Sequence, residues 1–212
     1  LEAGDTVVVT YRRKEEFERL EAAAEGLAAN LRGYACDVTV PARVADAHAR
    51  IVAEVGAVDA LVHVAGGYVD GMTVAETTDE IYDRYMDLNL RSAFLWARAV
   101  MPAMVERKRG KIVTISSRAA VSVFPGAGVY IASKAALLAL TQVLAAEGKP
   151  HNVQANAVLP SIIDTAVNRA AMPTADFTRW VQPAELASVI HFLASEDADK
   201  INGASIPVYG RA

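Results

Sequence analysis

Residues 111–134 read KIVTISSRAAVSVFPGAGVYIASK, and this stretch contains the local pattern that decides the fold. The residues after Lys111 are mainly apolar and β-branched without alternation, which is typical of a strand covered on both faces. A glycine-containing loop follows, and residues 130–148 then form a long stretch rich in Ala and Leu that is typical of a helix. A buried strand, a loop and a helix in this order indicate a parallel α/β fold.

The same alternation extends over the whole chain. We expect strands at Thr6–Thr10, Gly33–Cys36, Val58–Val64, Lys111–Ile115, Val153–Val158 and Ser205–Val208. We expect helices near 14–30, 41–55, 78–107, 130–148 and 183–195. No repeat or flexible linker divides the chain, so the sequence predicts one Rossmann-like domain over residues 1–212. Its doubly wound parallel sheet would lie between two layers of helices.

Composition excludes several functional classes. The chain has 212 residues, 53% of them hydrophobic, with 21 basic and 25 acidic side chains and a net charge of −4. This mixed charge indicates no nucleic-acid partner. Cys36 is the one cysteine, which excludes an internal disulfide. No apolar run of about 18 residues and no leader sequence is evident, so we expect a cytoplasmic protein without a membrane span.

Two expected helices are apolar nearly all round, at residues 93–105 and 131–146. A helix lying on a sheet needs only one apolar stripe, so a second apolar face favours contact with another subunit. We therefore expect a homodimer or homotetramer formed through helices 78–107 and 130–148. The alternative is that surrounding loops bury these helices deeply within one chain.

Tyr130 and Lys134 are the residues with the clearest chemical pattern. Four residues apart on a helix, they share one face. A nearby ammonium favours the phenolate and would lower the tyrosine pKa from about 10. A hydroxyl at the end of the preceding strand, Ser116 or Ser117, could bind a carbonyl oxygen. This arrangement suits carbonyl–alcohol interconversion, although a structural tyrosine on a buried helix would show the same spacing.

The ordered set of motifs resembles the short-chain dehydrogenase/reductase family over nearly the whole chain. Tyr130-x-x-x-Lys134 resembles its catalytic pair, and Ser117, 13 residues earlier, its catalytic serine. Asn89 matches the helix asparagine that holds a proton-relay water in the family. The resemblance implies an oxidoreductase that transfers a hydride between a nicotinamide cofactor and a small carbonyl or alcohol substrate. Tyr130 would be the general acid/base.

The resemblance also assigns cofactor-binding residues. Asp37 and Val38 resemble the segment that contacts adenine, and Tyr130 and Lys134 would also contact the cofactor. Ala65 and Gly66 would let the backbone approach the cofactor ribose. Pro160, Ile163 and Thr165 resemble the loop that cradles nicotinamide, with Ser161 in place of a glycine.

Cofactor choice depends on the end of the first expected strand. NAD-specific folds have an acidic residue there, whereas an Arg accommodates the 2′-phosphate of NADP. Tyr11 occupies this position and Arg12 follows it, so the sequence favours NADP over NAD, with no metal ion. The alternative is that Arg12 and Arg13 are solvated residues leading into an acidic helix.

Two features depart from the family pattern. His63 replaces the first Asn of the family's Asn-Asn-Ala-Gly motif, and a lone His ending an apolar strand is expected to be structural. The family opens with a strand and a glycine-rich phosphate loop before the segment that begins this chain. We therefore expect about 20–30 residues to be missing, judged from typical element lengths. Without that strand, its two neighbours would have unpaired backbone groups.

The segment from Val158 to Trp180 is similar to dihydropteridine reductases, as is Ala65-Gly66-Gly67, although those enzymes lack the serine present here as Ser117. In the family this segment is a mobile flap. The candidates for substrate contact are Arg169, Met172, Phe177 and Trp180, together with Ser117. Alternatively, the flap aromatics anchor the loop to the core. A non-catalytic binding or scaffold protein that has lost its phosphate loop is the second functional hypothesis.

Overall fold

The computed structural model describes residue 1 and residues 4–211. Contacts divide the chain into two compact units, Leu1–Ala57 and Val58–Ala212, and each is described by itself. The single-domain assignment stays a prediction. The described strands form two parallel sheets, of order β1-β2 in the first unit and β3-β4-β5-β6 in the second.

The first unit pairs β1 (Val7–Tyr11) with β2 (Leu31–Ala35) in parallel. Helix α1 (Lys14–Ala23) and a 3-10 turn (Glu25–Asn30) connect these strands, and α2 (Pro41–Glu54) follows β2. The Phe17 ring packs so closely on β2 that a Cβ on Gly33 would lie 2.6 Å from it. Glycine at this position therefore allows the amphipathic helix to lie against its own sheet.

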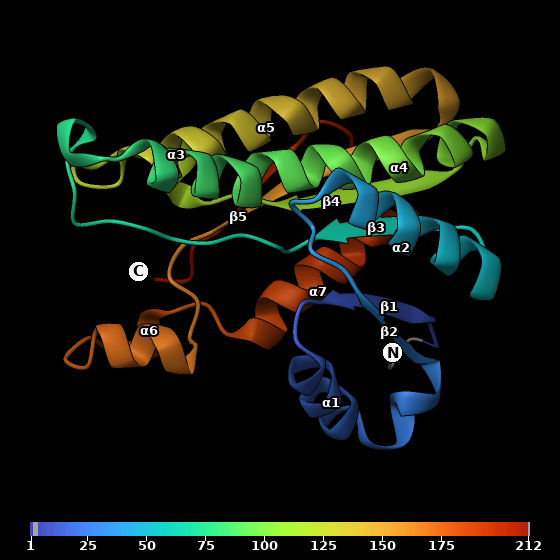
Figure 1. The fold of residues 1–212 in the computed structure, drawn as a ribbon, viewed down its shortest axis with the longest axis horizontal. Helices are drawn as coiled ribbons and strands as arrows, with labels where there is room; N and C mark the ends of the chain where they lie inside the picture. The colour runs from blue at the N-terminus through green and yellow to red at the C-terminus, as the bar shows by residue number, and fades with distance from the viewer. Residues whose placement is uncertain (2–3, 212) are drawn as a thin grey trace. The chain divides into compact units, whose positions relative to one another are not determined.

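The second unit is built around a four-stranded parallel sheet with helices on both faces (Figure 1). The long helices α4 and α5 cover one face and α7 covers the other. The strands are β3 (Ala60–His63), β4 (Gly110–Ile115), β5 (Val153–Pro160) and β6 (Ser205–Val208). The helices are α3 (Asp79–Met86), α4 (Ser92–Arg107), α5 (Gly128–Gly148), α6 (Ala166–Ala171) and α7 (Pro183–Ala194).

The two central strands of this sheet explain why their sequences are unalternated. Every residue of β4 and of β5 is buried. Helices pack on both faces, so neither face can tolerate a solvated side chain. Consequently the carboxyl ends of β4 and β5 lead directly into the loops that carry the polar residues of the site.

All six expected strands are present, with ends shifted by a few residues. The helix expected at 78–107 is divided into α3, a π-helical turn (Asp87–Arg91) and α4. The helix expected at 14–30 ends at Ala23 and continues as the 3-10 turn. Helix α6 has only six residues and no apolar periodicity, and the sequence did not indicate it.

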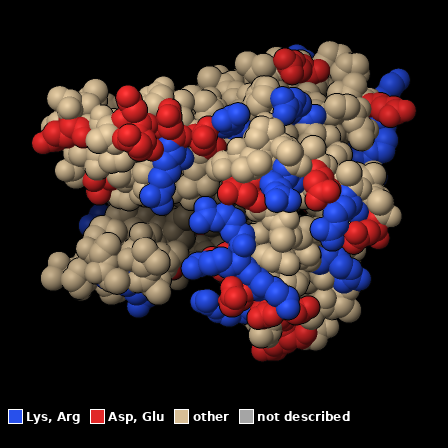
Figure 2. Space-filling model, in the orientation of Figure 1, with Lys and Arg blue, Asp and Glu red and all other residues tan. Residues whose placement is uncertain are grey.

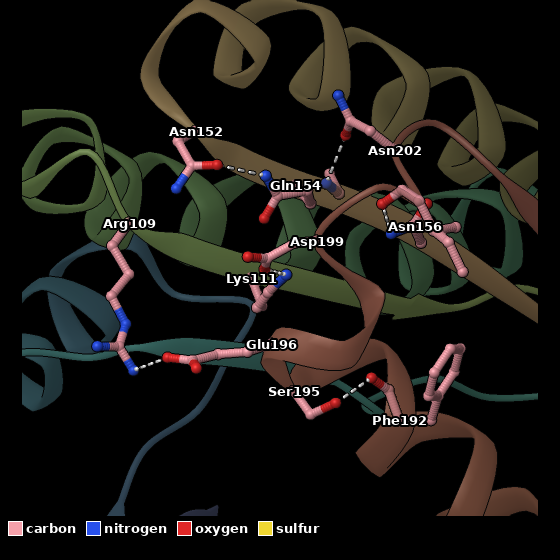
Figure 3. Close-up of polar contacts among 12 residues, drawn as sticks. Arg109, Lys111, Asn152, Gln154, Asn156, Phe192, Ser195, Glu196, Asp199 and Asn202 are labelled. Atoms are coloured by element: carbon pink, nitrogen blue, oxygen red, sulfur yellow. Dashed lines mark hydrogen bonds and ion pairs between the residues drawn. The ribbon is translucent and has the colours of Figure 1, made fainter.

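Polar side chains hold the segment that returns from α7 to β6 (Figure 3). The Lys111 ammonium on β4 contacts the Asp199 carboxylate at 2.5 Å. The Asn156 amide, 1% exposed on β5, donates to the Ile201 carbonyl at 2.8 Å and accepts from the Ala204 N–H at 2.9 Å. These bonds pair backbone groups that the core would otherwise leave unsatisfied.

Contrary to the expectation from apolar runs, one helical segment is long and apolar enough to cross a membrane. Residues Gly128–His151 have a mean hydropathy of 1.6 over their most apolar window, 39% of which is buried. Helix α5 lies within this segment and packs against β5 and α4. Length and hydropathy alone are weak evidence for a span, because a core helix has the same properties.

Candidate active site

The three residues of the expected catalytic set come together at the end of β4 and the start of α5. Ser117 follows β4, and its hydroxyl hydrogen-bonds the Tyr130 phenol. Lys134 lies one turn after Tyr130 on α5. Ser116, the other candidate hydroxyl, is instead buried and donates to the Lys134 carbonyl at 2.8 Å. The geometry therefore distinguishes Ser117 from its neighbour.

Lys134 is a buried cation beside this pair. Lys134 is only 5% exposed, and its Nζ donates to the Ile115 carbonyl at 2.8 Å. Burial lowers the pKa of the Lys134 ammonium from 10.5 to about 8. An ammonium has three donors, so the group retains capacity for further acceptors such as ribose hydroxyls.

The Tyr130 phenol differs from the sequence expectation in one respect. Burial raises its pKa above 10, and the Ser117 hydrogen bond only partly opposes this rise. The expected lowering by Lys134 is not seen in this structure, where the Lys134 ammonium bonds Ile115 instead. Tyr130 is therefore a protonated phenol at neutral pH, which is the form that can donate a proton.

Asn89 lies within the π-helical turn and is completely buried. Its Oδ1 accepts from the Gly67 N–H at 2.7 Å, while Nδ2 donates to the Gly67 carbonyl and the Ser133 hydroxyl. Ser133 in turn donates to the Tyr130 carbonyl at 2.7 Å. Asn89 thus connects the loop after β3 to the first turns of α5. Its role in holding a relay water stays a prediction.

Gly66 allows the closest approach in the site. A Cβ there would lie 3.0 Å from both Asn89 Oδ1 and Lys134 Nζ. A side chain would therefore crowd the two polar groups, whereas glycine leaves the Lys134 ammonium accessible from this side. Ala65 and Gly66 lie just after β3, in the loop that the sequence assigns to the cofactor ribose.

His63 is buried and structural in this arrangement, as its position at the end of an apolar strand indicated. Its Nε2 lies 3.0 Å from the Ser92 hydroxyl, which donates its own proton to the Leu88 carbonyl at 2.6 Å. We therefore assign the proton of the neutral ring to Nε2. Burial, reinforced by repulsion from Lys134, lowers the pKa of His63 from 6.5 to about 4.

The lowered pKa of His63 predicts that the protein becomes less stable in acid. Between pH 6.5 and about 4 the unfolded chain binds a proton at His63 that the folded chain does not. The His63 contribution is complete above pH 6.5 and falls by about 3 kcal/mol as the pH drops through this window. Urea unfolding of His63→Asn should therefore show a flatter pH profile than wild type. His151→Asn serves as the control, and an unchanged slope in His63→Asn would contradict the assignment.

The flap begins with the loop after β5. Pro160 ends β5, and Ile163 pairs with Val181 in an isolated bridge. Thr165 caps α6 by accepting from the Asn168 N–H at 3.2 Å. The expected nicotinamide loop is thus fixed at both ends by main-chain pairing and a helix cap.

The candidate substrate residues have different surroundings. The Arg169 side chain pairs with Asp164 and lies over the Phe177 ring at 4.7 Å. Phe177 packs on Trp180 with ring centroids 4.8 Å apart, and Trp180 is only 5% exposed. Trp180 therefore anchors the flap to the core, as in the alternative interpretation. Met172 and Phe177 are half-buried.

The first unit carries the other predicted cofactor residues. A cavity of about 350 Å³ is lined by Arg12, Ala35, Cys36, Asp37 and Arg43. Within the described residues, neither of the two guanidinium groups forms a hydrogen bond or salt bridge, whereas that of Arg13 is bound by Glu16. Asp37 accepts from the Thr39 N–H and hydroxyl, which lower the pKa of its carboxyl. Val38, the next predicted residue, is half-buried.

The sequence did not indicate several residues of the active site and of the cavity beside Arg12. Asp164, Ser133 and Tyr68 contact predicted residues, and Arg43 shares the cavity with Arg12. For Ser133 the signal was its place between Tyr130 and Lys134.

Comparisons with known proteins agree with this architecture. Residues 1–210 match the sequence family described as enoyl-(acyl carrier protein) reductase. Human dehydrogenase/reductase SDR family member 4 is 32% identical over 98% of this chain and 78% of its own. The 3-oxoacyl-acyl-carrier-protein reductase of Thermotoga maritima is 31% identical over 98% of this chain and 87% of its own.

Solved structures give the same result. A gluconate 5-dehydrogenase from Burkholderia cenocepacia, in complex with NADP and tartrate, is 30% identical with a TM-score of 0.90. The match covers 99% of this chain and 86% of that one. The chain belongs to the short-chain dehydrogenase/reductase family, and its Rossmann-like α/β fold is confirmed. Its relatives are dehydrogenases and reductases.

Proposed function

We propose that the protein is an NADP(H)-dependent oxidoreductase that interconverts a small carbonyl compound and its alcohol, with Tyr130 as general acid/base. The observation that carries the proposal is the hydrogen bond between Ser117 and Tyr130 beside the buried ammonium of Lys134. These groups combine a proton donor, a second hydroxyl and a positive charge in a site of low exposure.

In the reduction direction, the Ser117 and Tyr130 hydroxyls would bind the substrate carbonyl oxygen. As negative charge develops on that oxygen, the Tyr130 phenol donates its proton. A positive charge near the phenolate left behind would stabilise it, and Lys134, one helical turn after Tyr130 on α5, is the buried cation of the site. Asn89 and Ser133 hold the Tyr130 end of α5 against the loop after β3.

The nicotinamide cofactor would supply the hydride. Lys134 would donate to its ribose, next to the space that Gly66 leaves, and Pro160, Ile163 and Thr165 would face its nicotinamide end. In the first unit, Asp37 and Val38 would contact the adenine. The unpaired guanidinium of Arg12 suits a 2′-phosphate, and a solved relative binds NADP.

This cofactor proposal predicts that Arg12→Ala weakens NADPH binding by about 10- to 100-fold, because a charge-assisted hydrogen bond is lost. NADH binding should be unchanged. Fluorescence titration of both cofactors measures this. Arg13→Ala is the matched control, since Glu16 already binds that guanidinium. Equal loss for both cofactors would contradict the phosphate assignment, and binding of neither by wild type would favour the scaffold hypothesis.

We also propose a cytoplasmic homodimer or homotetramer formed through α4 and α5. Apolar side chains remain exposed on these helices, among them Phe94 at 46% and Val143 at 50%. A cavity lined by Met86, Leu90, Phe94 and Leu140, with Asp87 and Arg91, lies on the same helical surface. Light scattering of the purified protein tests the assembly, and cell fractionation tests the location.

A further inference from the structure

Arg169 lies in the flap, and its positive charge is already paired within the protein. Asp164 accepts from both sides of the Arg169 guanidinium, with Nε to Oδ1 at 2.5 Å and Nη2 to Oδ2 at 2.7 Å. Such two-point pairing fixes orientation as well as charge. The Asp164 side chain is 6% exposed, so the salt bridge has one largely buried partner.

Further contacts hold this ion pair in place. Gln182, just before α7, donates to Asp164 Oδ2 at 3.0 Å, and the Asp164 N–H donates to the Val181 carbonyl at 2.8 Å. The Arg169 and Gln182 bonds lower the pKa of the Asp164 carboxyl to about 2. On its other side, the Arg169 guanidinium lies over the Phe177 ring. Asp164 thus stays charged, and the Arg169 side chain, although 53% exposed, is paired along one edge of its guanidinium and stacked on one face.

The segment after β3, opposite the flap, also contains an acidic side chain that is bonded within the protein. Figure 2 shows a hollow between α6 and the segment after β3, and uncharged side chains form most of its α6 side. Tyr68, in that segment, packs its ring edge-on against Tyr130 at 4.8 Å. Its hydroxyl donates to Asp70 at 2.6 Å. The Asp70 carboxylate is therefore also engaged within the protein.

Apolar side chains border the same region. Val64 at 64% exposure and Val123 at 76% lie in the loops after β3 and β4, and Val167 at 77% lies on α6. The loops are joined where Met72 bridges Ala127, one residue before α5 begins. Exposed apolar groups on the loops that follow β3 and β4 and on α6 provide binding energy for an apolar ligand and none for a charged one.

Resting on the proposed function, we propose that the substrate is an uncharged carbonyl compound with an apolar body. Asp164 is a specificity-determining residue, because it withdraws the Arg169 guanidinium from the substrate. Arg169 is accordingly a positioning residue for the flap and not a partner for a substrate carboxylate.

A matched pair of ketones tests this inference. 2-Octanone and 7-oxooctanoate have the same chain length and the same reacting carbonyl, and differ in a terminal carboxylate. With NADPH, wild type should show kcat/KM at least about 100-fold higher for 2-octanone, because the Arg169 guanidinium is already paired with Asp164 and does not compensate the ligand carboxylate. A preference for 7-oxooctanoate, or for a polyhydroxylated ketone such as fructose, would overturn the inference but leave the proposed function intact. Turnover of none of them would overturn both.

Asp164→Asn tests the sequestering role. Removing the carboxylate charge frees the guanidinium, so kcat/KM for 7-oxooctanoate should rise about 10-fold relative to 2-octanone. The double variant Asp164→Asn/Arg169→Met should lose this gain, which separates it from general loosening of the flap. A gain that persists without Arg169, or no gain in the single variant with NADPH affinity preserved, would overturn the role of Asp164.

Discussion

Tyr130→Phe is expected to reduce turnover by at least about 10³-fold, the upper range for removal of a general acid. In the proposed mechanism the phenol is the proton donor, and burial holds its pKa high, so that it is protonated beside Ser117. The change removes one oxygen and keeps the ring that packs against Tyr68. NADPH affinity should therefore remain close to wild type.

Steady-state turnover and NADPH fluorescence titration measure the two quantities separately. Tyr82→Phe is the matched control, because Tyr82 lies on the surface of α3 and is 49% exposed. It should retain full activity. Retained turnover in Tyr130→Phe would show that the proton comes from another group.

Lys134→Met is expected to separate activity from stability. Loss of the ammonium should lower kcat/KM by about 100-fold or more, since the phenolate loses its counter-charge. The fold, in contrast, disfavours that charge, because burial lowers the pKa of Lys134 to about 8. At pH 7 removal of the buried charge therefore offsets loss of the hydrogen bond to Ile115.

The lowered pKa of Lys134 also predicts how the unfolding free energy changes with pH. Between about pH 8 and 10.5 the unfolded chain binds a proton at Lys134 that the folded chain has released, so wild-type stability rises with pH. The rise in unfolding free energy is about 3 kcal/mol over this window. Lys134→Met should lack it, whereas Lys149→Met, at a surface position, should retain it. A variant with wild-type pH dependence and wild-type activity would contradict both roles.

Local patterns predicted much of the fold because the central strands are covered on both faces. The unalternated runs that become β4 and β5 are continuous in sequence for this reason. The spacing of Tyr130 and Lys134 placed them on one helix face, and the predicted Ser117 hydroxyl hydrogen-bonds Tyr130 in the structure. By contrast, six-residue α6 is defined by the Thr165 cap and by tertiary contacts, which leave no periodic signal.

Other features depend on the three-dimensional environment. The π-helical turn at Asn89 interrupts a stretch that sequence periodicity reads as one helix. The direction of the Tyr130 pKa shift depends on burial, which outweighs the opposing hydrogen bond from Ser117. The pairing of Arg169 with Asp164 likewise depends on tertiary structure, because Gln182, which also binds Asp164, lies 18 residues away in sequence.

Deuterium transfer tests the central claim most directly. The protein is incubated with a ketone and NADPH carrying deuterium at both hydrogen positions of nicotinamide C4, and the alcohol is analysed by mass spectrometry. Wild type should place one deuterium on the former carbonyl carbon, and Tyr130→Phe should form almost no alcohol while still binding NADPH. Alcohol without deuterium, or equal labelled product from Tyr130→Phe, would contradict hydride transfer assisted by the Ser117, Tyr130 and Lys134 site.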